Sequence, residues 1–123
     1  MDWQFDCVKC IGAADDEYKN SVEDSRKREW LCGIAQMLEL ELTGKDVEAT
    51  LSADGYWSEK YTIPKQFNRV GIEYIKMRAA EMLGDFDRYN NYLAAFNAAK
   101  DSFCAYYVRT HGSNTKVGWK NVL

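Results

Sequence analysis

The chain has 123 residues, of which 46% are hydrophobic and 28% charged, and its formal net charge is −3. These values are ordinary for a single globular domain and argue against a disordered chain. The negative charge gives no electrostatic reason to expect binding to nucleic acid or an anionic membrane, and no apolar run approaches the roughly 20 residues that span a bilayer.

A first, short helix is predicted in the N-terminal segment. Asp2 is a suitable N-cap and Gly12 a natural stop. Four residues would share one helical face: Trp3, Cys7, Cys10 and Ile11. Because acidic residues stand where a signal peptide has a basic start, we expect a protein kept in a cytoplasm, with its four cysteines reduced.

A second, long helix is predicted to start at the acidic pair Asp15 and Asp16, because carboxylates complement the dipole of a helix N-terminus. The helical pattern continues, with a kink, as far as Gly44. Its apolar stripe consists of Leu31, Ile34, Ala35, Leu38 and Leu42.

The segment after Gly44 has a different character. Asp54-Gly55 is a turn dipeptide, and the residues on either side of it favour β-structure. We expect a short β-hairpin or an extended loop near residues 48–63, and the sequence leaves both open.

Two further helices are predicted as an antiparallel αα-hairpin. Pro64 suits the start of the first, which is apolar over most of its circumference and should be covered on more than one side. Gly84 ends it, and Asp85 or Asp87 caps the second helix, which ends at Gly112. The connection is so short that the two helices must pack against each other. One face of the second helix is largely aromatic: Tyr89, Tyr92, Leu93, Phe96, Ala99, Phe103, Tyr106 and Tyr107.

Residues 113–123 form a tail outside the domain of residues 1–112. The tail is too polar to bury itself, yet it contains Val117, Trp119, Val122 and Leu123. A segment of this composition either folds back or docks on another chain. We therefore predict a mainly α fold: a small bundle of about four helices with an extended C-terminal docking tail.

Signals for catalysis and for cofactor or metal binding are weak. Cys7-x-x-Cys10 has the spacing of half a zinc site, but Cys32 and Cys104 are isolated and His111 is the only histidine. Small core residues at helical spacing explain the pair better. The chain lacks a glycine-rich phosphate loop, and one histidine gives few options for acid–base chemistry. We expect neither an enzyme nor a cofactor.

Two alternatives involve partners. The basic residues Arg26, Lys27 and Arg28 raise the possibility of a small DNA-binding regulator, although neighbouring acids favour a solvated helical face with internal ion pairs. Residues 79–99 resemble one tetratricopeptide unit, but such arrays need about three units for stability. A cellular helical module for protein interactions therefore also remains an alternative.

The whole pattern resembles the head–tail connector (adaptor) proteins of tailed bacteriophages. The segment "DCVKCIGAADDEYKNSVEDSRKREWLCGIAQMLELELTG" is similar to their opening: a short helix, an acidic pair and a long helix that ends near Thr-Gly. The segment "IPKQFNRVGIEYIKMRAAEMLGDFDRYNNYLAAFNAAKDSF" is similar to their second half. There a proline starts a buried helix, which turns at Gly-Asp into a Tyr-rich helix. The likeness covers residues 5–110, and residues 45–63 depart from it.

The resemblance implies a structural virion protein made in the host cytoplasm and located at the head–tail junction. Its partners would be further copies in a ring of about twelve, the portal protein and the next tail or neck protein. DNA would pass through the channel without sequence-specific binding, and no membrane would be involved. The portal-docking tail would comprise Lys116, Val117, Gly118, Trp119, Lys120, Asn121, Val122 and Leu123. In the segment that departs from the resemblance, we expect Tyr56, Trp57 and Tyr61 in a loop that pairs with a neighbouring subunit or with the next ring.

Overall fold

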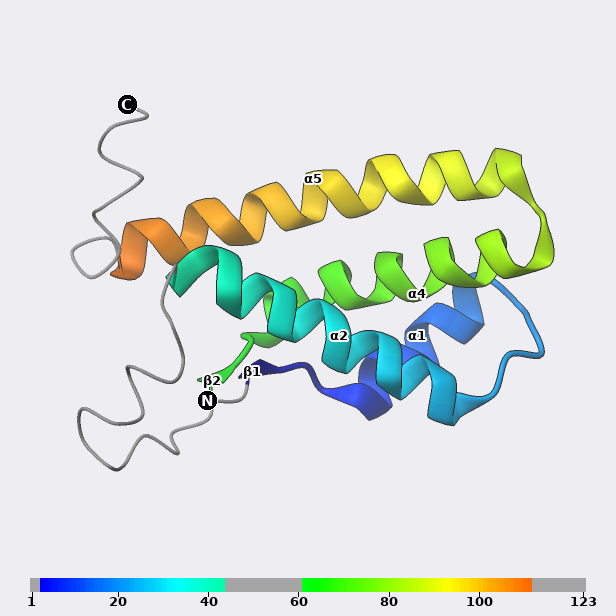
Figure 1. Cartoon of the computed structure of the whole chain (residues 1–123), viewed down its shortest axis with the longest axis horizontal. Coiled ribbons are helices and arrows are strands. Elements are labelled where there is room, and N and C mark those ends of the chain that lie inside the picture. Colours follow the sequence, from blue (N-terminus) through cyan, green and yellow to red (C-terminus); the bar gives the residue numbers. More distant parts are fainter. Residues whose placement is uncertain (1–2, 44–60, 112–123) are drawn as a thin grey trace.

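The computed structural model describes residues 3–43 and 61–111, which we call the helical body. Helices make up most of it, so the predicted mainly α class is confirmed. In chain order the elements in Figure 1 are β1 (Trp3–Gln4), α1 (Cys7–Glu17), α2 (Asp24–Thr43), β2 (Tyr61–Thr62), the 3-10 turn η1 (Lys65–Phe67), α4 (Asn68–Leu83) and α5 (Phe86–His111).

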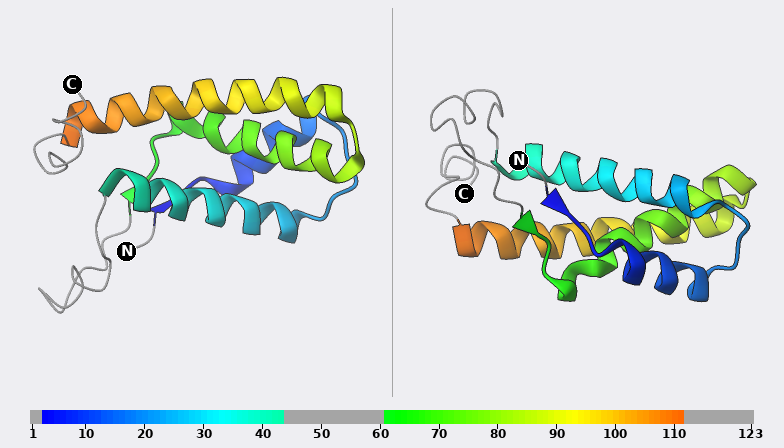
Figure 2. Two further views of the ribbon diagram at one scale, coloured as in Figure 1. Left: turned by 45° about the horizontal axis from the view of Figure 1, so that its top comes forward. Right: turned by 90° about the horizontal axis from the view of Figure 1, so that it is seen from below.

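α4 occupies the centre of the helical body. It contacts α5, α1 and α2, and Figure 2 shows these helices on different sides of it. Nearly every residue from Val70 to Ala80 is buried. This burial follows from the sequence, because a helix that is apolar over most of its circumference is stable only when neighbours cover several sides.

At Gly71, side chains from α1, α2 and the segment before α1 pack against the α4 backbone. A Cβ atom there would lie 2.7 Å from Cδ2 of Leu31 and 3.3 Å from both Sγ of Cys10 and Cδ1 of Phe5. Real Cβ atoms do not approach other atoms as closely as the first of these distances. The absence of a side chain at Gly71 therefore allows α2 and α1 to pack directly on the α4 backbone.

The chain reverses direction between α4 and α5. Gly84 caps α4 with φ of 75°, in the left-handed region that glycine adopts without strain. The backbone N–H of Asp85 donates to the carbonyl of Ala80 at 2.9 Å. α5 then runs back beside α4 for most of its length (Figure 1). Phe96, Phe103 and Tyr107 are buried on its inner side, as the aromatic face predicts, and Asn90, Asn97 and Asp101 are exposed.

The N-terminal segment differs from the prediction. A short N-terminal helix is present, but its predicted bounds are wrong, because Trp3 and Gln4 form a strand and α1 begins at Cys7. The N-cap is Asp6, whose Oδ1 accepts from the backbone N–H of Lys9 at 3.2 Å. Trp3 instead enters the core beside α5, with its ring centroid 5.1 Å from that of Tyr107. Burial of this large indole outweighs the local helix signal.

The boundary between the first two helices also differs. α1 continues through Gly12 to Glu17, so Asp15 and Asp16 lie in its last turn and do not begin α2. Where a kink was predicted, the chain leaves the helix before α2 begins at Asp24. In this connection Asn20 donates to the carbonyl of Tyr18 at 2.7 Å and accepts from the N–H of Val22 at 3.0 Å. The predicted apolar stripe of α2 is confirmed, with Leu31, Ile34, Ala35, Leu38 and Leu42 all buried.

The predicted hairpin near residues 48–63 falls largely outside the described residues. Its last part, β2, pairs with the N-terminal strand: Trp3 is opposite Tyr61 and Gln4 opposite Thr62, in parallel register. The backbone N–H of Ile63 also donates to the carbonyl of Gln4 at 3.0 Å. A local hairpin signal could not reveal this pairing, because the partner strand lies far away in the sequence.

Candidate functional site

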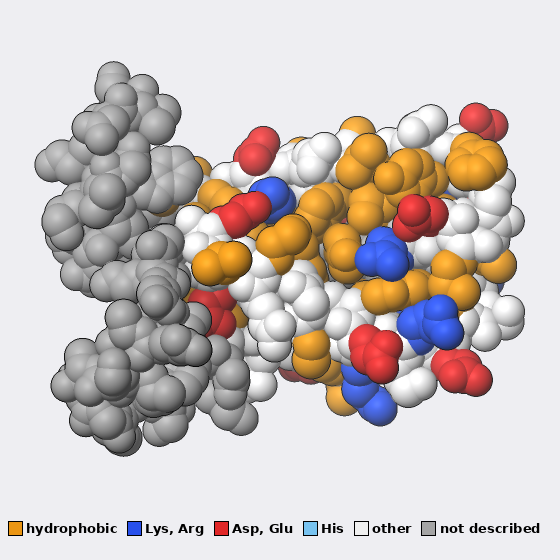
Figure 3. All heavy atoms as spheres, viewed as in Figure 1, with side chains coloured by type: hydrophobic (Ala, Val, Ile, Leu, Met, Phe, Trp, Pro, Cys, Tyr) orange, Lys and Arg blue, Asp and Glu red, His pale blue; other side chains and the backbone are white. Residues whose placement is uncertain are grey.

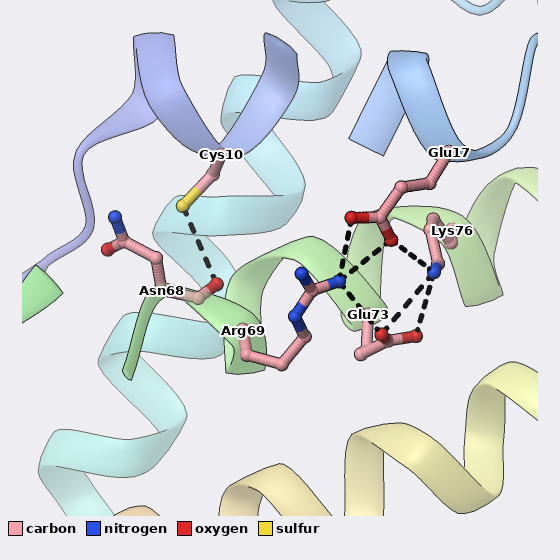
Figure 4. A network of polar contacts seen from close by, with 6 residues as sticks. All are labelled: Cys10, Glu17, Asn68, Arg69, Glu73 and Lys76. Atoms are coloured by element: carbon pink, nitrogen blue, oxygen red, sulfur yellow. Dashed lines mark hydrogen bonds and ion pairs between the residues drawn. The ribbon is translucent and has the colours of Figure 1, made fainter. Parts of the chain in front are cut away.

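Four charged side chains form a network between α1 and α4 (Figure 4), which we call the central ion cluster: Glu17, Arg69, Glu73 and Lys76. The carboxylate of Glu17 accepts hydrogen bonds from Nη1 of Arg69 and from Nζ of Lys76, both at 2.7 Å. Oε2 of Glu73 also accepts hydrogen bonds from these two donors, at 3.2 Å from Arg69 and 3.3 Å from Lys76. Two carboxylates and two cations leave the cluster without net charge.

The inner half of the cluster is buried. The side chains of Glu73 and Lys76 are only 8% and 9% exposed, and Nζ of Lys76 also lies 4.6 Å from the ring centroid of Tyr92 on α5. Oε1 of Glu73 has no hydrogen bond, but it lies 3.2 Å from Nζ of Lys76. Since an isolated buried charge is costly, each of these ions depends on its partner. The cluster therefore links α1, α4 and α5.

The electrostatics of the cluster favour permanent charge over proton transfer. The hydrogen bond from Arg69 is the main cause that lowers the pKa of Glu17, and the same bond raises the pKa of Arg69. A general acid at neutral pH needs a carboxyl group whose pKa is raised. Glu17 is shifted in the opposite direction, so this arrangement acts as a structural clamp.

A second clamp joins α1 to α2. Nζ of Lys27 lies 2.6 Å from Oδ1 of Asp15 and 4.0 Å from Oδ1 of Asp24, and the lysine side chain is 1% exposed. Asp15 thus offsets the burial of Lys27, which explains why an acidic residue occupies the last turn of α1, where the helix dipole disfavours it. Of the three basic residues in "SRKRE", only Arg26 and Arg28 are exposed.

Three of the four cysteines pack within the helical body, and Cys32 is exposed. Cys10 is fully buried, its thiol lies 3.8 Å from the carbonyl of Asn68, and burial raises its pKa to about 12. Burial also raises the pKa of Cys7 and of Cys104. These thiols are poor nucleophiles, since reactivity requires the thiolate. Among the described residues, no three His, Cys, Asp or Glu side chains lie together as metal ligands would.

The aromatic residues pack mainly against each other. Phe67 lies between α5 side chains, with ring centroids 5.3 Å from Phe103 and 4.9 Å from Tyr106. Tyr74 contacts Phe96 at 5.2 Å. These pairs account for much of the aromatic content of residues 61–111, and each adds about 1 kcal/mol beyond the area that it buries.

A small group of apolar side chains remains exposed where α4 turns into α5, and we call it the turn patch. Met82, Leu83 and Phe86 are 51%, 52% and 66% exposed. Figure 3 shows hydrophobic and acidic side chains close together at this end, and further hydrophobic side chains reach the surface between α2 and α5. Met37 and Leu40 on α2 are also exposed.

Of the predicted site residues, Tyr61 alone belongs to the part of the chain that the structure describes. Tyr61 belongs to β2, which pairs with β1. Tyr56 and Trp57 fall outside the described residues, and so does the predicted docking tail of residues 116–123.

Sequence reasoning missed both clamps and the turn patch. The spacing of Arg69, Glu73 and Lys76 does predict ion pairs within a helix. The connection to Glu17, 52 residues before Arg69, has no local signal. The turn patch was missed because the first helix of the predicted hairpin was expected to be covered on more than one side, which predicts no exposed apolar side chains at its end.

Comparisons of the chain with protein-family models, with curated proteins and with solved structures each found no match. Within residues 3–43 and 61–111, no helix combines the length and the apolar character that crossing a membrane requires.

Proposed function

We propose that the chain is a head–tail adaptor subunit of a tailed bacteriophage: a structural virion protein that forms a ring beneath the portal and extends the DNA channel. Its partners are further copies of itself, the portal protein and the next tail or neck protein. The proposal gives it no catalytic role. DNA passes through the ring without sequence-specific binding.

The observation that carries the proposal is the two-ended organisation of the helical body. β1, β2 and the C-terminal end of α5 meet at one end, where the ring of Trp3 lies 5.1 Å from that of Tyr107 and Trp3 pairs with Tyr61. The segments of residues 44–60 and 112–123 both attach at this end, which we call the tail end (Figure 1). The turn patch lies at the other end. A subunit placed between two other components needs a contact surface at each end.

The arrangement of the helices also supports the proposal. The adaptor resemblance implies a helical bundle in which a buried helix turns at Gly-Asp into a Tyr-rich helix. In this chain α4 is the buried helix, Gly84 and Asp85 form the turn, and α5 carries the tyrosines. We infer that the α4–α5 pair is the antiparallel hairpin of that bundle. The clamps from Glu17 and Lys27 then hold α1 and α2 against it.

Deletion of residues 113–123 tests the assignment of the tail to the portal. The truncated chain should keep the helical circular dichroism of the full chain, because the deleted residues lie outside the helical body. It should no longer co-purify with the portal protein encoded in the same genome. If it still co-purifies as the full chain does, the tail is not the docking element.

The alternative of a DNA-binding regulator is less well supported by the structure, because the buried lysine of "SRKRE" has its charge paired with Asp15. Arg26 and Arg28 are then the two residues of this motif that could contact phosphates. Electrophoretic mobility shifts at low salt with the Arg26→Gln/Arg28→Gln variant test this alternative. A loss of salt-sensitive binding in that variant would favour the regulator over the adaptor.

A further inference from the structure

The turn patch carries an acidic rim. Glu81 precedes it in the chain, Asp85 lies between Leu83 and Phe86, and Asp87 follows. Two of these acids have a basic neighbour: Nε of Arg78 lies 3.2 Å from Glu81, and Nε of Arg88 lies 3.6 Å from Asp85. Within the helical body, no Lys or Arg side chain lies within ion-pair distance of Asp87. The patch therefore presents apolar area with an excess of negative charge, which suits an apolar partner that carries basic side chains.

The tail of this same chain has the required composition. Residues 113–123 contain Lys116 and Lys120 and no acidic side chain. They also contain four apolar side chains: Val117, Trp119, Val122 and Leu123. An aromatic anchor between two cations matches the apolar patch and its acidic rim, and buried aromatic anchors carry much of the binding energy of an interface.

The length of α5 prevents the Trp119 backbone from reaching Phe86 of its own chain. Twenty-five residues of helix separate Phe86 from His111, which is about 37 Å at 1.5 Å per residue. Trp119 follows His111 by eight residues, which span at most about 29 Å when fully extended. Within one chain, the anchor could touch the patch only through its side chain and with all eight residues fully extended along α5, whereas the tail of a second copy meets no such restriction.

We propose that the turn patch of one copy binds the basic, apolar tail of a second copy. Each copy then has one donor segment at the tail end and one acceptor patch at the turn end. Such a contact is heterologous, so it produces either a closed ring or an open filament. This proposal goes beyond the adaptor function and does not depend on it. If the portal also binds the tail, the portal and the neighbouring copy compete for one segment.

Sedimentation velocity of the full-length chain measures this contact directly. The wild-type chain should self-associate, and the association should weaken as salt is raised from about 50 to about 500 mM, because charge complementarity contributes to it. Phe86→Ser in the patch and the double change Lys116→Glu/Lys120→Glu in the tail should each weaken self-association at least tenfold. Val8→Ser is the matched control. It removes an apolar side chain that is 82% exposed on α1, away from the acidic rim, and should leave association unchanged.

Mixing the two defective variants shows whether the contact joins tail to patch. The Phe86→Ser chain keeps an intact tail, and the Lys116→Glu/Lys120→Glu chain keeps an intact patch. Their mixture should form a one-to-one pair that grows no further, because each pair contains one working tail on one working patch. A contact between two identical surfaces could not be restored in this way.

Three outcomes overturn the proposal: a wild-type chain that stays monomeric up to about 1 mM, full self-association in either variant, or no pairing in the mixture. Circular dichroism must first show that the Phe86→Ser chain is folded, and the tail variant leaves the sequence of the helical body unchanged. Loss of portal binding would not mimic these results, since no portal is present in the experiment.

Discussion

Among single residues, the most distinctive are charged side chains that are buried in the helical body. A helical fold held by apolar contacts alone would not contain them. Lys27, Glu73 and Lys76 are buried, and each has an oppositely charged partner within 3.3 Å. A buried ion pair adds little stability compared with apolar residues of the same shape, but loss of one partner costs about 3–5 kcal/mol. These residues therefore specify which helices meet, because a different packing would leave a buried charge unpaired.

The pH dependence of stability should reveal the role of Glu17. Its carboxyl pKa lies below the ordinary 4.5 in the folded state, so the ionised form stabilises the fold. This contribution is present above pH 4.5 and is lost as the pH falls through the lower folded-state pKa. Glu17→Gln should reduce the free energy of unfolding by about 1–2 kcal/mol at pH 7. Urea unfolding should show a smaller difference from wild type at pH 3.

Asp16→Asn is the matched control for that experiment. Asp16 is exposed, lies beside Glu17 on α1 and takes no part in the central ion cluster. Its substitution should change the free energy of unfolding by less than about 0.5 kcal/mol at both pH values. Equal losses in the two variants, or a Glu17→Gln loss that does not depend on pH, would show that the cluster does not clamp α1 to α4.

The second clamp predicts a large difference between neighbouring basic residues. Lys27→Ala removes a side chain that is 1% exposed and the charge that faces Asp15, so it should reduce the free energy of unfolding by about 3 kcal/mol. Arg26→Ala, at an exposed position one residue earlier, should change it by less than about 0.5 kcal/mol. Chemical denaturation of both variants at pH 7 makes the comparison. Similar values for the two would mean that Lys27 is not buried.

At the scale of elements, the close approach of α1, α2 and α4 at Gly71 makes two glycine substitutions act in opposite directions. Gly71→Ala places a methyl group 2.7 Å from Leu31 in a packed core and should destabilise the protein by about 1–3 kcal/mol. Gly33→Ala on α2 meets no atom within 4 Å and should stabilise it by up to about 1 kcal/mol through helix propensity. Thermal unfolding measures both. A stabilising Gly71→Ala change would contradict the close packing at this position.

The sequence predicted those elements whose signals are local. The stripe of α2, the all-round apolar pattern of α4 and the stop at Gly84 each depend on residues within a few turns of one another. The failures share a different cause. Trp3 is drawn into an extended strand by contacts with Tyr61 and Tyr107, and Asp15 lies inside α1 because Lys27 pairs with it. Helix-capping rules contain no information about partners so distant in the chain. For the same reason, neither clamp could be placed in advance.

At the scale of the whole molecule, the two ends of the helical body differ in kind. The tail end gathers both strands and the attachment points of residues 44–60 and 112–123, and the turn end presents the turn patch (Figure 1). The central ion cluster has no net charge and ties α1 to α4, and the second clamp ties α2 to α1. A subunit with a different surface at each end can bind two different neighbours, which is the role that we propose for it at the head–tail junction.

The most direct test of that role is the mass of the complex that the chain forms with the portal protein of its own genome. The tagged chain and that portal protein would be produced together, and the purified complex would be measured by native mass spectrometry. We expect a portal ring that carries many copies of this chain, about twelve as the adaptor resemblance implies. A genome without a portal gene near this one, or a chain recovered free of the portal, would contradict it.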